Sequence, residues 1–198
     1  FAVLYPDINL LNADADLNPI EINALNDPVF PILLVKSKQN PGSGIQKQLI
    51  APESKLLGVM LPNSPLLSMV ASDFGKPIIA TSANISGSPI LFTEEQVKEN
   101  LSHVYDHIIS HNRKISQPQD DSVWRFSPLH QTRIIIRRSR GMAPAYWQKC
   151  KDEFPPTLAA GADLKSSFGI AGKSQIYLSQ YSGDLSGYQN QLQFTHIL

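Results

Sequence analysis

Short apolar runs that end at Pro, Gly, Asn or Asp alternate with polar stretches over the first 140 residues. Apolar runs bounded by turn formers are typical of strands that are buried in a sheet. Residues 39–54 are instead mostly polar and contain Pro and Gly, which predicts a loop with at most a short strand at 48–50. The predicted strands cover residues 1–5, 31–35, 56–61, 78–81, 105–110, 122–125 and 132–137.

Helical patterns lie between several of these strands. Asn18 followed by Pro19 is a typical helix start, with Asn as the N-cap and Pro at the first helical position. Thr93 and Gln96 have the spacing of a capping box. Over residues 64–74 the apolar positions recur with the period of a helix. The predicted helices cover residues 19–25, 64–74 and 94–101, and their alternation with strands predicts an α/β fold.

A change of pattern after residue 140 predicts a domain boundary. Residues 141–156 contain three prolines and no period, as expected of a linker. Short strands joined by tight turns are predicted next, at residues 157–163, 166–171 and 175–179. We therefore expect a first domain, a linker and the start of a second domain, at residues 1–140, 141–156 and 157–198.

The segment that follows the predicted strand at 78–81 is rich in small polar residues. Thr81 is followed closely by Ser82, Asn84 and Ser86. Hydroxyl, amide and backbone N–H groups that converge at a strand end are suited to binding phosphate or carboxyl oxygens. An ordinary turn between a strand and a helix uses the same residue types, so both interpretations stay open on the residues alone.

The sequence TSANISG at 81–87 resembles the loop of YrdC-type nucleotide-binding domains, which form carbamoyl-type adenylates from ATP. Other segments resemble, in the same order, those of the hydrogenase-maturation carbamoyltransferase family (HypF). An ordered set of this kind is more specific than any single motif. The segments are GVMLPNSPL at 58–66, HNRKI at 111–115, DDSV at 120–123, RRSRGMAP at 137–144, GADLK at 161–165 and SQYSGDL at 179–185.

The resemblance implies a fold and an activity. The fold would be α/β, a YrdC-like twisted mixed sheet with helices, followed by the opening β-strands of an actin/hexokinase-like domain. The activity would be that of an ATP-dependent carbamoyltransferase, in which carbamate from carbamoyl phosphate reacts with ATP to form carbamoyl adenylate. The carbamoyl group would then pass to the C-terminal cysteine of a hydrogenase-maturation partner protein. The implied cofactors are ATP and Mg²⁺, with zinc bound in an upstream region of the family.

The resemblance also implies roles for particular residues, among which there is no catalytic nucleophile and no metal ligand. The implied nucleotide-binding residues are Thr81, Ser82, Asn84, Ser86, Ser122, Arg138 and Arg140. The implied phosphate loop of the second domain contains Asp163, Lys165 and Ser166.

On the residues alone, other interpretations of these positions stay open. Arg137, Arg138 and Arg140 can clamp phosphate or can place charge at an exposed sheet edge. If the strand continues through them, Arg138 and Arg140 share one face. Asp120 and Asp121 can bind Mg²⁺ or can form a turn before the next strand.

Two other functions agree with parts of the sequence. Ala83 gives the loop the form TSAN, which is usual in threonylcarbamoyl-adenylate synthases of tRNA modification, whereas TSGN is commoner in the hydrogenase-maturation family. The segments elsewhere favour the latter family and cover more of the chain. A non-catalytic module that binds double-stranded RNA is the other alternative. A formal net charge of zero argues against nucleic acid as a partner, because phosphate-driven binding usually needs a basic surface.

Composition bears on whether the chain can form a packed core, on membrane association and on cellular location. Hydrophobic residues make up 42% of the 198 residues, which is enough for a packed core. No apolar segment approaches the roughly 20 residues of a membrane-spanning helix, so no membrane partner is expected. A single cysteine, Cys150, excludes an internal disulfide and fits a cytoplasmic location.

Phe1 is not a start of translation, so we expect a piece of a longer protein. In the resembled family, a basic segment that serves the nucleotide precedes this point. We therefore expect residues 1–198 alone to catalyse little or no adenylation.

His103, His107 and His111 recur at intervals of four, a spacing that lets zinc ligands share one helix face. The intervening Val104 and Ile109 favour a strand, and the extended backbone of a strand would break that helical geometry. No zinc site is expected here.

Overall fold

The computed structural model describes residues 1–198 except for 149, 150, 152 and 165. The described chain divides into two compact units. The first contains Phe1–Thr81 and Asp121–Gly141, and the second contains Ser82–Asp120 and Met142–Leu198. Cys150 and Lys165, both singled out in the sequence, lie outside the described residues.

Among the described residues, the first unit contains a six-stranded mixed sheet with the strand order β4-β1-β3-β2-β5-β6. The four central strands show the mixture, since β3 is parallel to β1 and antiparallel to β2, and β2 is parallel to β5. These strands confirm six of the seven predicted over the first 140 residues. Their bounds are β1 Ala2–Leu4, β2 Ile32–Lys36, β3 Leu56–Met60, β4 Ile78–Ala80, β5 Val123–Phe126 and β6 Arg133–Arg137.

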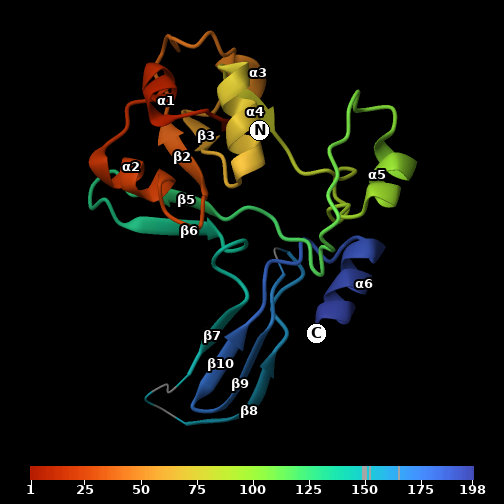
Figure 1. Ribbon diagram of the computed structural model, residues 1–198. Coiled ribbons are helices and arrows are strands. Elements are labelled where there is room, and N and C mark those ends of the chain that lie inside the picture. The colour runs from red at the N-terminus through yellow and green to blue at the C-terminus, as the bar shows by residue number, and fades with distance from the viewer. Residues whose placement is uncertain (149–150, 152, 165) are drawn as a thin grey trace. The chain divides into compact units, whose positions relative to one another are not determined.

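The helices of the first unit lie near β2 and β3 in Figure 1. α2 (Pro19–Leu25) begins where predicted, and Asn18 and Glu21 form a complete capping box there. α4 (Pro65–Phe74) is capped by Ser64 and ends at Gly75, whose φ is 65°. α1 (Ile8–Asp14) was not predicted, although Asp7 caps it by accepting a hydrogen bond from the Leu10 N–H.

The short strand predicted at 48–50 is wrong, because Lys47–Ile50 forms the helix α3. The N–H of Ala51 donates to the carbonyl of Lys47, which closes one helical turn. An apolar pair in a polar segment has no period long enough to separate a turn of helix from a strand.

The core of the first unit lies where β1, β2, β3 and β5 meet. Val3, Leu33, Leu57 and Val59 are fully buried there. Trp124 of β5 is 1% exposed, and the Arg133 guanidinium lies 4.5 Å from the centre of its ring. This packing holds the strands from which the candidate site extends.

A buried carboxylate fixes the loop after β2. Tyr5 and Asp14 are both fully buried, and the Tyr5 hydroxyl donates to Asp14 at 2.7 Å. The backbone N–H of Ser43 donates to the same carboxylate at 2.9 Å, and so does the Ser43 hydroxyl. Burial, reinforced by the bond to Asp14, raises the pKa of Tyr5 above its usual range.

Replacing Tyr5 by Phe should lower the free energy of unfolding by about 1.5–3 kcal/mol at pH 7, because a buried hydrogen bond to a carboxylate is lost. The raised pKa gives stability that is fully present below the ordinary tyrosine pKa of about 10 and is lost as the pH rises above it. Urea unfolding between pH 7 and 11 should therefore show the two proteins converging at high pH. The exposed Tyr146→Phe is the control, and an equal effect of both substitutions would contradict this account.

The second unit contains α5 (Glu94–Leu101), α6 (Tyr188–Ile197) and an antiparallel sheet with the order β7-β10-β9-β8. Thr93 and Gln96 form the predicted capping box of α5. The predicted strands after residue 156 are confirmed with shifted bounds, whereas α6 was not predicted. The sheet strands are β7 Ala145–Trp147, β8 Phe154–Ala159, β9 Gly169–Lys173 and β10 Gln175–Leu178.

The strand expected at residues 105–110 is wrong. These residues form no strand, because β-propensity without a partner strand does not make a sheet. The predicted linker at 141–156 contains β7, which pairs with β10, and the start of β8 at Phe154. The domain boundaries themselves stay a prediction.

The described residues between 160 and 168 form a loop, called here the 160–168 loop, in place of the tight turn predicted between the first two strands of the second sheet. Phe168 at its end is 1% exposed and packs edge-to-face against Phe194 of α6, with ring centres 5.8 Å apart. The Phe168 N–H donates to the Ser179 hydroxyl, and the Ser179 N–H donates to the Phe168 carbonyl, both at 2.8 Å. These contacts join the loop to β10 and α6. None of the described helices has both the length and the apolar character needed to cross a bilayer.

Candidate functional site

The loop that follows β4 contains four of the predicted nucleotide-binding residues, Thr81, Ser82, Asn84 and Ser86. β4 is the edge strand beside β1, in antiparallel register. Thr81, Ser82 and Ser86 are exposed, and Asn84 is half-buried. The sheet thus ends in a solvent-accessible polar loop, as the sequence predicts.

Ser82 and Asn84 interact directly. The Ser82 hydroxyl donates to Asn84 Oδ1 at 2.5 Å. The Asn84 Nδ2 group donates to the carbonyls of Ile85 at 3.0 Å and Ser88 at 3.1 Å. Asn84 therefore uses its amide to shape the loop, while the Ser82 hydroxyl needs only to rotate to donate to a ligand.

The backbone of this loop offers hydrogen-bond donors. Leu91 N–H donates to the Ala83 carbonyl at 2.8 Å, and Ser88 N–H donates to the Ile85 carbonyl at 2.9 Å. Within the part of the chain that the structure describes, the successive N–H groups of residues 85, 86 and 87 donate to no protein acceptor. Gly87 has φ of 79°. Successive unpaired N–H groups beside a left-handed residue are suited to an anion.

Ser122 lies in the first unit and is fully buried. Its hydroxyl donates to the Arg140 carbonyl at 2.9 Å and accepts from the Ser139 N–H at 2.9 Å. Because a hydroxyl has one proton, Ser122 as it stands has none left to donate to a phosphate oxygen. It holds the chain where that chain leaves β6.

Arg140 is held by several acceptors at once. Its Nε and Nη2 atoms donate to Asp121 Oδ1 at 3.0 and 2.5 Å. Nη1 donates to the Val29 carbonyl at 3.2 Å, and Nη2 also donates to the Phe30 carbonyl at 3.1 Å. A phosphate would have to compete with these bonds, so a nucleotide contact by Arg140 stays a prediction.

The three arginines do not follow the strand alternation that the sequence suggested. β6 ends at Arg137, whose Nε donates to the Asp121 carbonyl at 2.7 Å. The chain turns after this residue, with Gly141 at φ of 79°, so alternation does not place Arg138 and Arg140 on one face. Arg138 is half-buried, and burial lowers the pKa of its guanidinium from the ordinary value.

The loop predicted to approach phosphate in the second sheet is held by its own backbone. The Asp163 carbonyl accepts from the Leu185 N–H at 2.7 Å. Ser166 is fully buried, its N–H donates to the Gly183 carbonyl, and its carbonyl accepts from the Ser182 N–H, both at 2.8 Å. The Ser166 and Ser182 hydroxyls are buried and have no hydrogen-bond partner among the residues that the structure describes. A ligand could reach Ser166 only after this loop moved.

Asn190 in the first turn of α6 is a residue that the sequence analysis missed. It is 6% exposed, and its Nδ2 group donates to the Gly87 carbonyl at 3.1 Å and to the Asp184 carbonyl at 2.8 Å. Gly87 belongs to the predicted nucleotide loop. No local sequence signal marks its contact with this loop, because Gly87 lies far from Asn190 along the chain.

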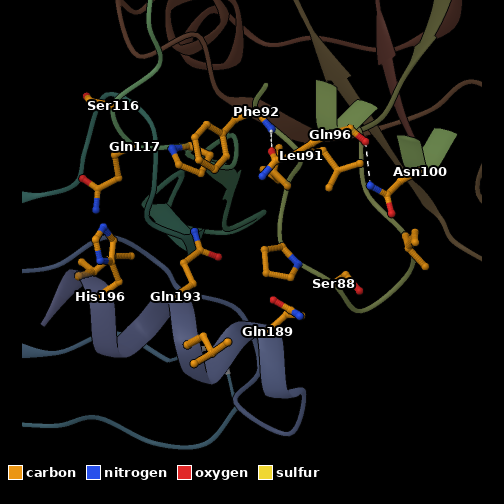
Figure 2. Close-up of a pocket in the computed structure, with 16 residues that line it drawn as sticks. Ser88, Leu91, Phe92, Gln96, Asn100, Ser116, Gln117, Gln189, Gln193 and His196 are labelled. Atoms are coloured by element: carbon orange, nitrogen blue, oxygen red, sulfur yellow. Dashed lines mark hydrogen bonds between the residues drawn. The ribbon is translucent and has the colours of Figure 1, made fainter. Parts of the chain in front are cut away.

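A groove of about 800 Å³ runs within the second unit between the segment at 85–92 and α6 (Figure 2). Its polar wall contains Gln117, Gln189, Gln193 and His196. Among the described residues that line it there is no Lys, Arg, Asp or Glu. The groove thus lacks the cations that would neutralise a triphosphate.

Magnesium, which the family resemblance implies, does not find a dedicated site among these groups. The Asp121 carboxylate is already paired with Arg140. Over the described residues, no three His, Cys, Asp or Glu side chains gather closely enough to bind a metal ion. Mg²⁺ that accompanies a nucleotide is usually held by one or two carboxylates and by the phosphates themselves.

Comparison with known families assigns the class of this fold. The sequence model of the Sua5/YciO/YrdC family, described as "Telomere recombination", matches residues 1–139. The model described as the HypF Kae1-like domain matches residues 152–198. The chain belongs to the Sua5/YciO/YrdC family, and the predicted fold class is confirmed.

Curated relatives that match along most of the chain are HypF carbamoyltransferases, as the sequence motifs suggested. The HypF of Synechocystis sp. is 32% identical over 96% of this chain, and that of Rhodobacter capsulatus is 32% identical over 85%. The chain spans about a quarter of the length of these relatives, 24% and 22%. The threonylcarbamoyl-AMP synthase of Vibrio vulnificus is 34% identical over only 31% of this chain.

Solved structures agree with this assignment. The whole chain superposes on 30% of full-length HypF in a phosphate- and nucleotide-bound form, with a TM-score of 0.89 and 31% identity. E. coli YciO shares the fold over 70% of this chain and 65% of its own, with a TM-score of 0.56 and 20% identity.

Proposed function

We propose that this chain is part of an ATP-dependent carbamoyltransferase that forms carbamoyl adenylate. The observation that carries the proposal is the order of the two family matches, a Sua5/YciO/YrdC domain followed by a HypF Kae1-like domain in one chain. The HypF relatives match both parts, whereas the threonylcarbamoyl-AMP synthases match about a third of the chain.

In the proposed reaction, a carbamate oxygen attacks the α-phosphorus of ATP, and pyrophosphate leaves. Hydrolysis of carbamoyl phosphate supplies the carbamate and releases inorganic phosphate. Such a step needs in-line positioning of the carbamate and neutralisation of the phosphate charge. The N–H groups of residues 85–87 would bind phosphate oxygens, and the Ser82 hydroxyl would rotate to donate to the acyl or phosphate group. Asn84 would keep this loop in shape through its bonds to Ile85 and Ser88.

The roles of Thr81, Ser86, Ser122, Arg138 and Arg140 at the nucleotide belong to the same proposal. Ser122 and Arg140 would act chiefly by holding the turn after β6, because their side chains are already bonded to the protein. Bound Mg²⁺ would supply charge neutralisation at the phosphates.

The later steps are proposed from the same family match. The Kae1-like domain would transfer the carbamoyl group to the C-terminal cysteine of a partner protein, for the maturation of [NiFe]-hydrogenase. Asp163, Lys165 and Ser166 would lie at the phosphate loop of that domain. Lys165 lies outside the described residues.

The test is ATP–pyrophosphate exchange by the complete product of the gene that encodes this chain. Carbamoyl phosphate and, in parallel, threonine with bicarbonate serve as acyl sources. Exchange that requires carbamoyl phosphate supports the proposal. Exchange only with threonine and bicarbonate would assign the protein to tRNA modification instead, and exchange with neither would overturn adenylate formation.

A further inference from the structure

One side chain joins the predicted nucleotide loop to the helix of the second family domain. Asn190 lies within the HypF Kae1-like match, and Gly87 lies within the Sua5/YciO/YrdC match. Both residues belong to the second compact unit. The Asn190 Nδ2 group donates one hydrogen to the Gly87 carbonyl at 3.1 Å and the other to the Asp184 carbonyl at 2.8 Å.

The burial of Asn190 distinguishes it from the other amides of α6. Asn190 is 6% exposed, whereas Gln189 is exposed and makes no hydrogen bond to the described residues. Figure 2 shows Gln189 on α6 and Ser88 on the facing segment at the same end of the groove. A buried amide with both hydrogens donated is costly to replace, because its acceptors would lose their partner away from water.

The bond from Asn190 extends a network that begins at the predicted site. Ser82 donates to Asn84, and Asn84 donates to the carbonyls on either side of Ser86 and Gly87. Asn190 then holds the Gly87 carbonyl itself. The conformation of the segment at 82–91 is therefore fixed from two directions, by its own asparagine and by the asparagine of α6.

We propose that Asn190 is a positioning residue that holds the 82–91 loop and couples it to the segment at 184–190. What the loop binds rests on the proposed function, but the coupling itself does not. Coupling of this kind is reciprocal, so a ligand that orders the loop also orders the start of α6. Nucleotide bound in the first family domain would in this way change the order of α6 in the second family domain.

If Asn190 only stabilised the start of α6, its replacement would not affect the 82–91 loop. Gln191 distinguishes this local role from the proposed coupling. The Gln191 Nε2 group donates to the Leu185 carbonyl at 2.6 Å, so it fixes the same turn without touching the 82–91 loop. Asn190→Leu removes both donors at similar volume, and Gln191→Leu is the matched control. If Asn190→Leu does not fold, Asn190→Asp takes its place. The Asp side chain keeps the shape of Asn but lacks the N–H donors.

The first measurement is amide hydrogen exchange in the 198-residue chain without ligand. The N–H groups of Ser88 and Leu91, both bonded within the loop, should exchange about tenfold faster in Asn190→Leu and unchanged in Gln191→Leu. Unchanged exchange of the Ser88 and Leu91 N–H groups in Asn190→Leu would overturn the coupling. Equal acceleration by Asn190→Leu and Gln191→Leu would overturn it too.

The second measurement separates positioning from structure alone. In the complete gene product, Asn190→Leu should raise the KM for ATP in pyrophosphate exchange about tenfold, with a smaller change in kcat, and Gln191→Leu should not. Faster loop exchange with an unchanged KM would overturn the positioning role. If the wild-type protein shows no pyrophosphate exchange, the proposed function fails, and the hydrogen-exchange result still decides the coupling.

Discussion

Asn84→Ala is expected to lower kcat/KM for carbamoyl-phosphate-dependent ATP–pyrophosphate exchange by about 10²–10³-fold in the complete gene product. The Asn84 amide donates hydrogen bonds to the carbonyls of Ile85 and Ser88 and accepts a hydrogen bond from the Ser82 hydroxyl. Without it, the loop N–H groups would no longer stay aligned toward one anion, and the alignment would have to be restored in every turnover.

The stability of the fold should change little in this variant, because most side chains of residues 81–87 are exposed. Asn100→Ala is the matched control, since Asn100 is an exposed asparagine whose Nδ2 group donates to the Gln96 carbonyl of its own helix and to no other described residue. Activity of Asn84→Ala within threefold of the wild-type protein would remove the loop from the proposed mechanism.

Gly161→Ala is expected to destabilise the second sheet by about 4 kcal/mol or more, an effect in the range of backbone incompatibility. Gly161 has φ of 78°, and a Cβ atom there would lie 2.0 Å from the Ser167 carbonyl oxygen. That oxygen belongs to the backbone of the same 160–168 loop, so no side-chain rotation relieves the contact. The loop would have to open, and the packing of Phe168 against Phe194 would be lost.

Gly172→Ala provides the comparison for Gly161→Ala. A Cβ atom on Gly172 meets no heavy atom within 4 Å, and its φ lies outside the left-handed region. Urea unfolding and hydrogen exchange of the Ser166 and Ser179 N–H groups should both respond to the Gly161 substitution alone. Similar unfolding curves for the two variants would show that the 160–168 loop tolerates a Cβ atom.

The elements that the sequence predicted well have local causes. α2 begins at Asn18 because the capping side chain and its partner Glu21 are three positions apart. α1 has the same kind of signal, an Asp7 cap that accepts from Leu10, but Pro6 and Asp7 are equally typical of the end of the strand predicted at 1–5. α6 begins at Gly187 without a side-chain cap, and its glutamine-rich sequence has no clear apolar stripe.

The candidate site divides in the same way between local and distant partners. The contact between Ser82 and Asn84 could be anticipated, because the two residues are neighbours in one loop. The bonds of Arg140 to the Val29 and Phe30 carbonyls, and of Asn190 to Gly87, join segments about 100 positions apart, so no motif predicts them. The strand expected at 105–110 failed for a related reason, because only the fold decides which apolar segment finds a partner.

The order of synthesis matters for a unit built from two separate stretches of chain. β2 pairs with β5 through Ile32 and Val123, so the first sheet can be completed only after about 90 intervening residues have been translated. Until then, one side of β2 has no neighbouring strand, and a strand in that state is prone to pair with another chain. Nascent chains that end before about residue 140 should therefore depend on chaperones, because the first unit is still incomplete in them.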